Sequence, residues 1–315
     1  MKLLITRLRI PRPAEHKGRP SHRRHKVLTV LLGTALTLGV CLAAESIPRR
    51  KAVPASVPAQ EGKALPVICY SQVLTDGEKG GKRTVSADML RQDLAWLADH
   101  RCETVSCSDV IGFARGLEQL SEKPVLLLFD GSWETILTAV LPLLEEQSAK
   151  AAAVICGSDA DLYSAQVPKK EEDARLSWNE IRLLDQSPLV ELVSGSYDLR
   201  QEKGSSGRRG VSMLRKEGFE TYRAFLADDL LTLQNRMNEE LSHDASVFCY
   251  PFGEKSEESE AVLKDLGFLM TLSEGEGIAR ISDKNSLFGI PFTVREPEQT
   301  AEEFFGQIGL EEPLA

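Results

Sequence analysis

Residues 125–133 read Val-Leu-Leu-Leu-Phe-Asp-Gly-Ser-Trp, and this stretch decides the fold. The unbroken apolar run over 125–129 predicts a strand that is buried on both faces, as in a parallel sheet. Asp130 follows at once and opens a polar loop. A second apolar run, over 190–194, also leads into a polar loop, at residues 195–199. Both strands are therefore expected to deliver polar residues to an edge of the sheet.

Strand-like and helix-like segments alternate along the rest of the chain. Short apolar runs predict strands at residues 66–70, 103–106, 125–129, 151–156, 190–194, 247–250, 268–272 and 288–294. Apolar residues at helical spacing and capping residues predict helices at 86–100, 108–115, 134–146, from 177, at 220–241, 256–266 and from 300. Pro142 must bend or end the third of these helices. This alternation predicts a parallel sheet with helices outside it, and the number of units favours a closed or nearly closed barrel.

In such barrels, functional residues lie at the carboxyl ends of the strands. Asp130, the loop at 195–199 and the Pro-Phe-Gly turn at 251–253 each follow a predicted strand. Three stretches that are distant in the sequence are thus expected to converge on one face of the barrel.

The residues at these strand ends resemble the motifs of the polysaccharide deacetylase (NodB-homology) family. Phe129-Asp130 is similar to the start of the first motif, Phe-Asp-Asp-Gly. Residues 194–199 are similar to the second motif, Ser-His-Thr-Tyr-Asp-His, and residues 248–253 keep the outline of the third. The resemblance covers residues 65–294. It implies an irregular (β/α)-barrel of about seven strands, and a metal-dependent hydrolase of carbon–nitrogen bonds in N-acetylated sugars.

The same alignment leaves the family's metal site without ligands. Gly131 stands at the metal-binding Asp, and Gly195 and Leu199 stand at the two metal-binding His. Glycine and leucine have no donor atom in their side chains, and metal affinity depends on the number and type of ligands. We therefore expect no metal cofactor such as zinc. Asp130 keeps the position of the family's catalytic base, and its alternative role is to cap a helix or bond to a loop.

Aromatic residues near the strand ends are candidates for substrate binding. Trp133, Tyr197, Tyr250 and Phe252 can form a surface on which sugar rings stack. Pro251 belongs to the turn that the resemblance makes one wall of the substrate groove. The alternative is that these residues only pack against the barrel.

Charge is distributed unevenly along the chain. Residues 1–51 hold 12 Lys and Arg against two Asp and Glu, and the rest holds 26 against 45, a balance of −19. A field of this sign does not attract nucleic acid or anionic wall polymers. We expect no nucleic-acid partner, whereas neutral or cationic glycans suit the domain better.

The amino-terminal region predicts a membrane segment. Residues 1–26 are basic and should remain in the cytoplasm, and residues 27–44 are uncharged. As a helix, this stretch is about 27 Å long, just enough for a bilayer core. A linker at 45–63 then leads to the domain at 64–315, which we expect outside the cytoplasm. The alternative is a cleaved signal sequence, which gives a secreted protein.

The cysteines do not predict a disulfide framework. Five of the six lie after residue 44, so they cannot all pair with one another. Cys102 and Cys107 are close enough in sequence to form one disulfide.

These observations lead to three hypotheses about function. The first is an extracytoplasmic, polysaccharide deacetylase-like protein of cell-envelope carbohydrate metabolism that has lost catalysis. Such a pseudoenzyme binds an N-acetylated polysaccharide or an envelope protein. The second is an active, divergent N-deacetylase of a polysaccharide. The third is a structural or interaction domain whose groove has closed.

Overall fold

The computed structural model describes residues 62–75, 77, 80–165, 174–204 and 207–310. The predicted membrane segment at 27–44 and most of the linker lie outside these residues. Within the part of the chain that the structure describes, no helix combines the length and apolar character that a membrane crossing requires.

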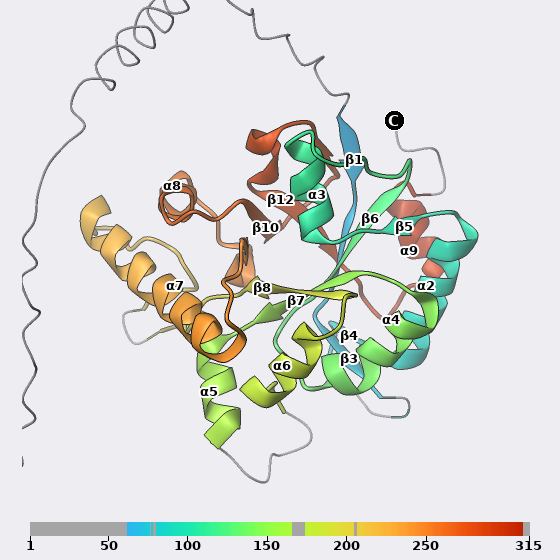
Figure 1. Ribbon diagram of the computed structural model, residues 1–315, viewed down its shortest axis with the longest axis horizontal. Helices are drawn as coiled ribbons and strands as arrows, with labels where there is room; N and C mark the ends of the chain where they lie inside the picture. Colours follow the sequence, from blue (N-terminus) through green and yellow to red (C-terminus); the bar gives the residue numbers. More distant parts are fainter. Residues whose placement is uncertain (1–61, 76, 78–79, 166–173, 205–206, 311–315) are drawn as a thin grey trace, which may run out of the picture. The chain divides into compact units, whose positions relative to one another are not determined.

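Seven parallel strands form a closed barrel (Figure 1). Their order is β2 (Val67–Tyr70), β12 (Ile290–Val294), β10 (Met270–Glu274), β9 (Val247–Cys249), β8 (Val190–Ser194), β7 (Ala151–Ile155) and β6 (Pro124–Phe129). The ring closes because β2 pairs with both β12 and β6. It is irregular, since β8 and β9 join at the single residue pair of Ser194 and Phe248. The predicted irregular (β/α)-barrel of about seven strands is confirmed.

Alternate residues of each strand face two different layers. In β6, Leu126 and Leu128 pack with the cluster that fills the barrel. Leu127 and Phe129 face outward and pack with helix residues such as Leu90. Because both faces of the strand are covered, β6 is a continuous apolar run.

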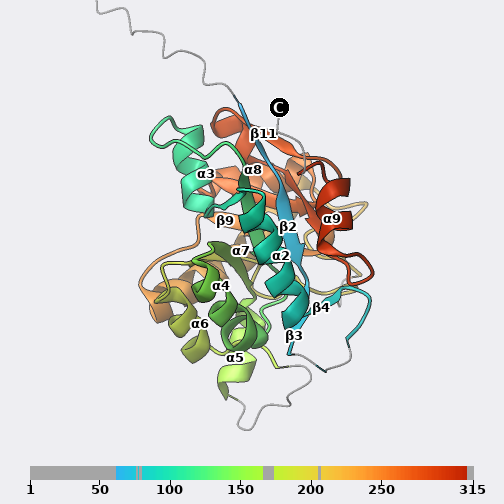
Figure 2. The ribbon, with the colours of Figure 1, turned by 90° about the vertical axis from the view of Figure 1, so that its right-hand side faces the viewer.

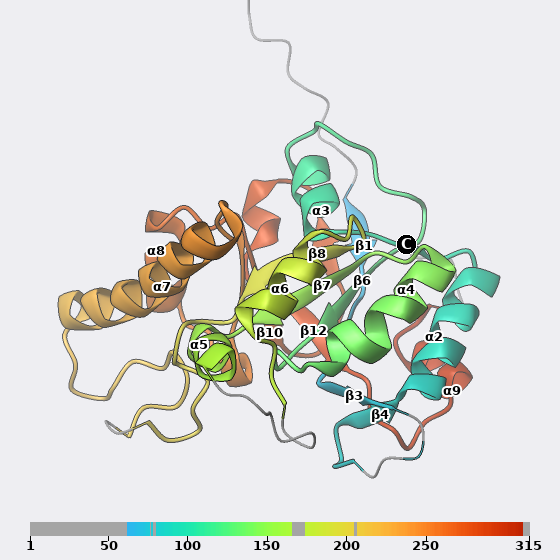
Figure 3. The ribbon, with the colours of Figure 1, turned by 60° about the horizontal axis from the view of Figure 1, so that its bottom comes forward.

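Two groups of helices lie on opposite sides of the barrel in Figures 1 and 3. One group contains α2 (Ala87–Asp99), α4 (Leu141–Gln147) and α9 (Ala301–Gln307). The other contains α7 (Phe219–Leu241) and α8 (Glu257–Asp265). The helices α5 (Gly157–Ala165) and α6 (Trp178–Asp185) contact each other, and α6 also contacts α7.

The two ends of the barrel carry different elements. Figure 2 shows α3 (Cys107–Ala114) toward one end of β2, and the pair of β3 (Gln72–Leu74) and β4 (Thr84–Ser86) toward the other end. Because β3 follows β2 in the chain, the β3–β4 pair marks the carboxyl end of the strands.

Local sequence signals set the ends of several helices. The Ser86 hydroxyl accepts a hydrogen bond from the Met89 N–H at 3.1 Å and caps α2. The capping boxes that begin at Ser177 and Thr300 are both present. Pro142 does not end the predicted helix, because it lies in the first turn of α4, which continues to Gln147. The helix changes geometry just before the proline, where a π-helical turn at Ile136–Val140 precedes α4.

Several short elements were not predicted. They are β1 (Lys63–Leu65), which pairs with β11 (Ala279–Ile281), the β3–β4 pair and α5. The strand predicted at 103–106 is present but shorter, as β5 (Glu103–Thr104). Each strand is too short to show an apolar period. The helix α5 buries only two residues, so its sequence carries almost no amphipathic pattern.

The five described cysteines are free thiols. Cys102 and Cys107, which the sequence allowed to pair, do not form a disulfide in the structure. Cys107 is buried at the start of α3, and burial raises the pKa of its thiol. It therefore packs as a small apolar residue.

Candidate functional site at the carboxyl end of the barrel

A cavity of about 900 Å³ lies at the carboxyl end of the barrel. Residues at the ends of five strands line it: Ser71, Asp130, Tyr250, Glu274 and Val294. Phe252 and Gly253 of the third motif line it as well, together with Arg200, which follows the second motif. The predicted convergence of three distant stretches is therefore present in the structure.

Asp130 is held by a guanidinium in this cavity. Arg200 Nη1 donates to Asp130 Oδ2 at 3.0 Å, and Arg200 Nη2 donates to Oδ1. The backbone N–H of Gly131 donates to the same Oδ1 at 2.9 Å. Burial opposes the charge of Arg200, but the charge of Asp130 and its hydrogen bonds outweigh burial and raise the pKa of Arg200. The cavity thus contains a fixed, two-bond aspartate–arginine pair.

Trp133 and Arg175 form one wall of the cavity. The Trp133 indole N–H donates to the Ser71 carbonyl at 2.7 Å, which fixes the ring. The guanidinium carbon of Arg175 lies 3.3 Å from the ring centroid, and Arg175 donates to the Gly131 carbonyl. One face of the indole is therefore covered by a guanidinium. Burial lowers the pKa of Arg175, and the positive charge of Arg200 contributes to this shift.

Two exposed ion pairs lie at the rim. Arg209 pairs with Glu254, and its guanidinium carbon lies 4.7 Å from the centroid of Phe252. Arg83 pairs with Glu274, the last residue of β10. Exposed pairs of this kind contribute little to stability.

The predicted sugar-stacking residues do not all reach the cavity. Trp133, Tyr250 and Phe252 line it. Tyr250 is buried, and its hydroxyl accepts a hydrogen bond from Ser259. Pro251 is also buried and is not among the lining residues, and neither is Tyr197. The structure therefore does not bring the four aromatic rings together on one surface.

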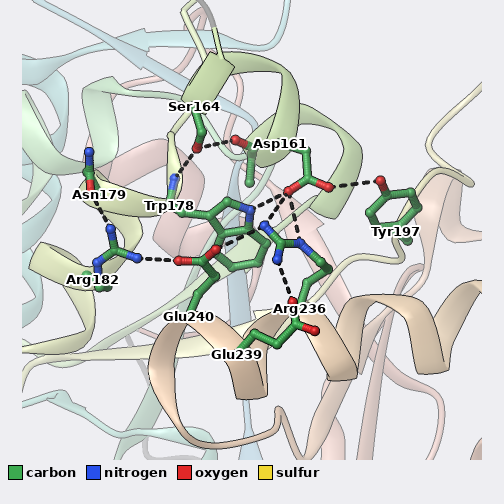
Figure 4. Close-up of polar contacts among 10 residues, drawn as sticks. Asp161, Ser164, Trp178, Asn179, Arg182, Tyr197, Arg236, Glu239 and Glu240 are labelled. Carbon is green, nitrogen blue, oxygen red and sulfur yellow. Dashed lines mark hydrogen bonds and ion pairs between the residues drawn. The ribbon is translucent and has the colours of Figure 1, made fainter. Parts of the chain in front are cut away.

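Tyr197 points into a polar network between α5, α6 and α7 (Figure 4). Its hydroxyl donates to Asp161 Oδ2 at 2.9 Å. Asp161 Oδ1 accepts from the Trp178 indole N–H at 2.6 Å and from Arg236 Nη2 at 2.8 Å. Burial acts to raise the pKa of Asp161, but these hydrogen bonds outweigh it, and the pKa is lowered. Tyr197 thus anchors the second-motif loop to the helices.

A second carboxylate, which the sequence gave no reason to single out, holds the same loop. Asp229 on α7 accepts hydrogen bonds from the backbone N–H groups of Tyr197 and Asp198, both at 2.8 Å. Burial raises the pKa of Asp229 to about 6, although the two N–H groups act in the opposite direction. The loop that carries the second motif is therefore held by two hydrogen bonds to α7.

The residues present do not fit the metal site that the resemblance implies. A Cβ atom on Gly131, whose φ is +92°, would lie 2.4 Å from the Trp133 indole nitrogen. A Cβ atom on Gly195 would lie 2.5 Å from Val154 Cγ1. Neither position accepts a larger side chain unless its neighbours move.

Leu199, at the third aligned ligand position, and the positive charge beside Asp130 are also unsuited to a metal ion. Leu199 packs against the apolar cluster under α7 and α8. The guanidinium of Arg200 already engages Asp130, and its positive charge repels a divalent cation. Among the described residues, no group of three or more His, Cys, Asp or Glu side chains has a metal-binding arrangement.

Sequence reasoning missed Arg200 and Arg175. Arg200 lies directly after Leu199. A basic residue at the end of the second motif was therefore the one sequence feature that could have indicated its place in the site. No feature of the sequence indicated that Arg175 belongs to the site, because an isolated bridge between two loops brings it to Trp133.

Comparison with known proteins gives a consistent result. The family model described as polysaccharide deacetylase matches residues 118–271. Poly-beta-1,6-N-acetyl-D-glucosamine N-deacetylase from Escherichia coli (strain K12) is 26% identical over 243 residues. The match covers 71% of this chain and 35% of that protein, so this chain spans about a third of the relative's length.

Solved structures share the fold. A de-N-acetylase from Aggregatibacter actinomycetemcomitans matches with a TM-score of 0.66 at 20% identity, covering 78% of this chain and 99% of that chain. The structure of IcaB from Ammonifex degensii matches with a TM-score of 0.63 at 19% identity, covering 80% and 99%. At this level of identity, the likeness supports the barrel and its topology.

Proposed function

This chain contains a polysaccharide deacetylase (NodB-homology) domain, and from that premise we propose that it is a non-catalytic protein that binds an N-acetylated polysaccharide. The ligand lies in the cavity at the carboxyl end of the barrel. The relatives carry deacetylase names, and the glycan is carried over from them as part of the proposal.

The bond between Arg200 and Asp130 carries this proposal. The guanidinium engages both oxygens of the carboxylate that aligns with the family's catalytic base. The three aligned ligand positions offer no donor atoms and little space for larger residues. A protein with this arrangement retains the groove but lacks the means to activate water with a metal. We therefore also propose that it needs no metal cofactor.

The cavity suits a polyhydroxylated ligand. Its volume lies within the range of small-molecule sites. Each of its arginines lies close to a carboxylate, so the site offers both hydrogen-bond donors and acceptors. Hydroxyl and acetamido groups both donate and accept, and they can therefore bond to such a wall without carrying charge. The filled-groove hypothesis has no support here, because only the aligned metal position is occupied by side chains and the cavity above it is open.

The location and partners of the protein complete the proposal. The basic segment at 1–26 and the uncharged segment at 27–44 support an anchored protein with its domain outside the cytoplasm. The glycan partner is then a polysaccharide of the cell envelope. An envelope protein is the other partner that the open cavity can accept.

Calorimetric titration of the full-length chain with N-acetylglucosamine oligomers, in β-1,4 and β-1,6 linkage, tests the proposal. We expect saturable binding and no acetate release. Phe252→Ala should weaken binding about tenfold, because Phe252 lines the cavity. Phe219→Ala is the matched control, since Phe219 is exposed at the start of α7 and does not line the cavity. Absence of binding to every oligomer contradicts the proposal.

The rival function is an active, divergent deacetylase, and one observation favours it. Asp130 remains in the cavity beside a fixed cation, and a guanidinium can polarise a carbonyl oxygen. If this is correct, acetate is released and the release stops in Asp130→Asn.

A further inference from the structure

We propose that the cavity prefers a glycan that carries free amino groups beside its acetamido groups, and that Glu202 binds the ammonium group. This inference rests on the proposed function and names the ligand class of the same site. Glu202 lines the cavity at the turn that follows the second motif.

The charges of the cavity support a cationic ligand. Four arginines line it, and each lies within ion-pair distance of one carboxylate: Arg83 with Glu274, Arg175 with Asp159, Arg200 with Asp130, and Arg209 with Glu254. A guanidinium that already has a carboxylate partner gains little from an anionic ligand, because binding the ligand breaks the existing pair. The arginines therefore make the site polar rather than positive.

Glu202 is the carboxylate in excess. It is exposed, and it has no hydrogen bond or ion pair with any residue that the structure describes. When Glu202 is counted, the described residues of the cavity and their ion-pair partners hold five carboxylates and four guanidinium groups. An ammonium group on the ligand completes this balance without displacing any pair.

The field of the whole domain acts in the same direction. Residues 52–315 hold 26 Lys and Arg and 45 Asp and Glu. A negative field of this size attracts cations to the cavity mouth and repels anionic glycans. The preference should therefore weaken as salt screens the exposed charges.

The proposal also indicates which reaction supplies the ligand. A free amino group on an N-acetylated glycan arises when water cleaves the amide carbon–nitrogen bond, leaving acetate and an amine that takes up a proton at neutral pH. The protein then acts after an N-deacetylation that another enzyme performs. It recognises the modified polymer rather than making it.

Three forms of one tetrasaccharide test the inference on the full-length chain. They are chitotetraose, the same tetramer with one acetyl group removed, and the tetramer oxidised to carboxylates at C6. At about 0.02 M salt, we expect the amino form to bind about fivefold more tightly than the acetylated form, and the carboxylate form most weakly. At about 0.3 M salt, the difference should fall below about twofold.

Two variants separate the local contact from the general field. Glu202→Gln should remove most of the preference for the amino form, measured as the ratio of the two affinities within each protein. Glu146→Gln changes the net charge equally on the exposed side of α4, outside the cavity, and should keep the preference.

The outcomes distinguish this inference from the proposed function. If the acetylated and amino forms bind equally, or the carboxylate form binds best, the inference is wrong while glycan binding stands. If Glu202→Gln keeps the full preference, Glu202 is not the ammonium site. If no form binds, the proposed function itself fails.

Discussion

Two aspartate–arginine pairs in this protein are each joined by two hydrogen bonds but lie in different surroundings. In the core, Arg295 Nε and Nη2 donate to Asp93 at 2.9 and 3.1 Å, and the two side chains are 1% and 0% exposed. In the cavity, the side chains of Arg200 and Asp130 are 19% and 17% exposed. Each carboxylate accepts a third hydrogen bond, from the Tyr70 hydroxyl at 3.0 Å for Asp93 and from the Gly131 backbone N–H at 2.9 Å for Asp130. The arginines differ, because all three side-chain nitrogens of Arg295 donate hydrogen bonds, whereas Arg200 Nε is buried and has no hydrogen-bond partner among the described residues.

The difference indicates different roles. The Asp93 network joins β2, α2 and the end of β12, where the barrel closes, and its side chains are buried. Asp130 and Arg200 lie in an open cavity and form an incomplete network. A fully satisfied buried pair serves the fold, whereas a partly satisfied pair in a cavity can serve a ligand.

The largest effect should come from breaking the core pair. Asp93→Asn leaves Arg295 as an unpaired buried charge, so we expect the free energy of unfolding to fall by about 3–5 kcal/mol. Urea denaturation of the full-length variant measures this change. A loss below about 1 kcal/mol would mean that the core network does not stabilise barrel closure.

Restoring a family carboxylate should be the next most harmful change. Gly131→Asp places a Cβ atom 2.4 Å from the Trp133 indole nitrogen at a φ of +92°, and we expect a loss of about 2–3 kcal/mol. Gly277→Asp is the matched control, because its φ is +93° and nothing lies within 4 Å. Equal losses in the two variants, measured by thermal unfolding, would show that Trp133 does not block the ligand position.

Asp229 is a buried carboxylate that has backbone N–H groups rather than an arginine as hydrogen-bond partners, and burial raises its pKa. Its pKa rises to about 6 in the folded state from 3.8, so folding favours its protonated form. The stabilising contribution is then complete below about pH 4 and is lost as the pH rises through 6. Relative to Asp229→Asn, wild-type stability should fall by about 2 kcal/mol between pH 4 and 7. If the difference in the free energy of unfolding between the two proteins stays constant across this pH range, the pKa of Asp229 is not raised.

The smallest effect on stability should come from the cavity pair. Asp130→Asn leaves Arg200 partly exposed, so we expect a loss of about 1–2 kcal/mol, less than for the same substitution at Asp93. Glycan affinity should fall in the same variant, whereas Asp93→Asn should keep its affinity in the fraction that remains folded. If Asp130→Asn costs more stability than Asp93→Asn, the contrast between the two pairs is wrong.

The sequence predicted the barrel because its signals are local. Apolar runs such as 125–129 and caps such as Ser177 report on burial and helix ends within a few residues. Pro142 lies where the helix changes from a π-helical turn to α4, so its effect is local as well. The convergence of strand ends then followed from the alternation of strands and helices.

The chemistry of the cavity was harder to predict, because it depends on contacts between distant residues. Arg200 meets Asp130 across 70 positions in the sequence, and Arg175 meets Gly131 across 44. Tyr197 was expected on a sugar-stacking surface, but the bond to Asp161 turns its ring toward the helices. The direction in which a side chain at the cavity rim points depends on partners from other elements. The local sequence pattern does not identify those partners.

The decisive measurement is the metal content of the purified full-length chain after dialysis against zinc, cobalt and nickel. If the guanidinium of Arg200 takes the place of a metal beside Asp130, as we propose, each metal should be present at less than one tenth of an equivalent per chain. An N-acetylglucosamine oligomer should then release no acetate. One tightly bound metal per chain, together with acetate release that is lost in Asp130→Asn, would contradict this proposal.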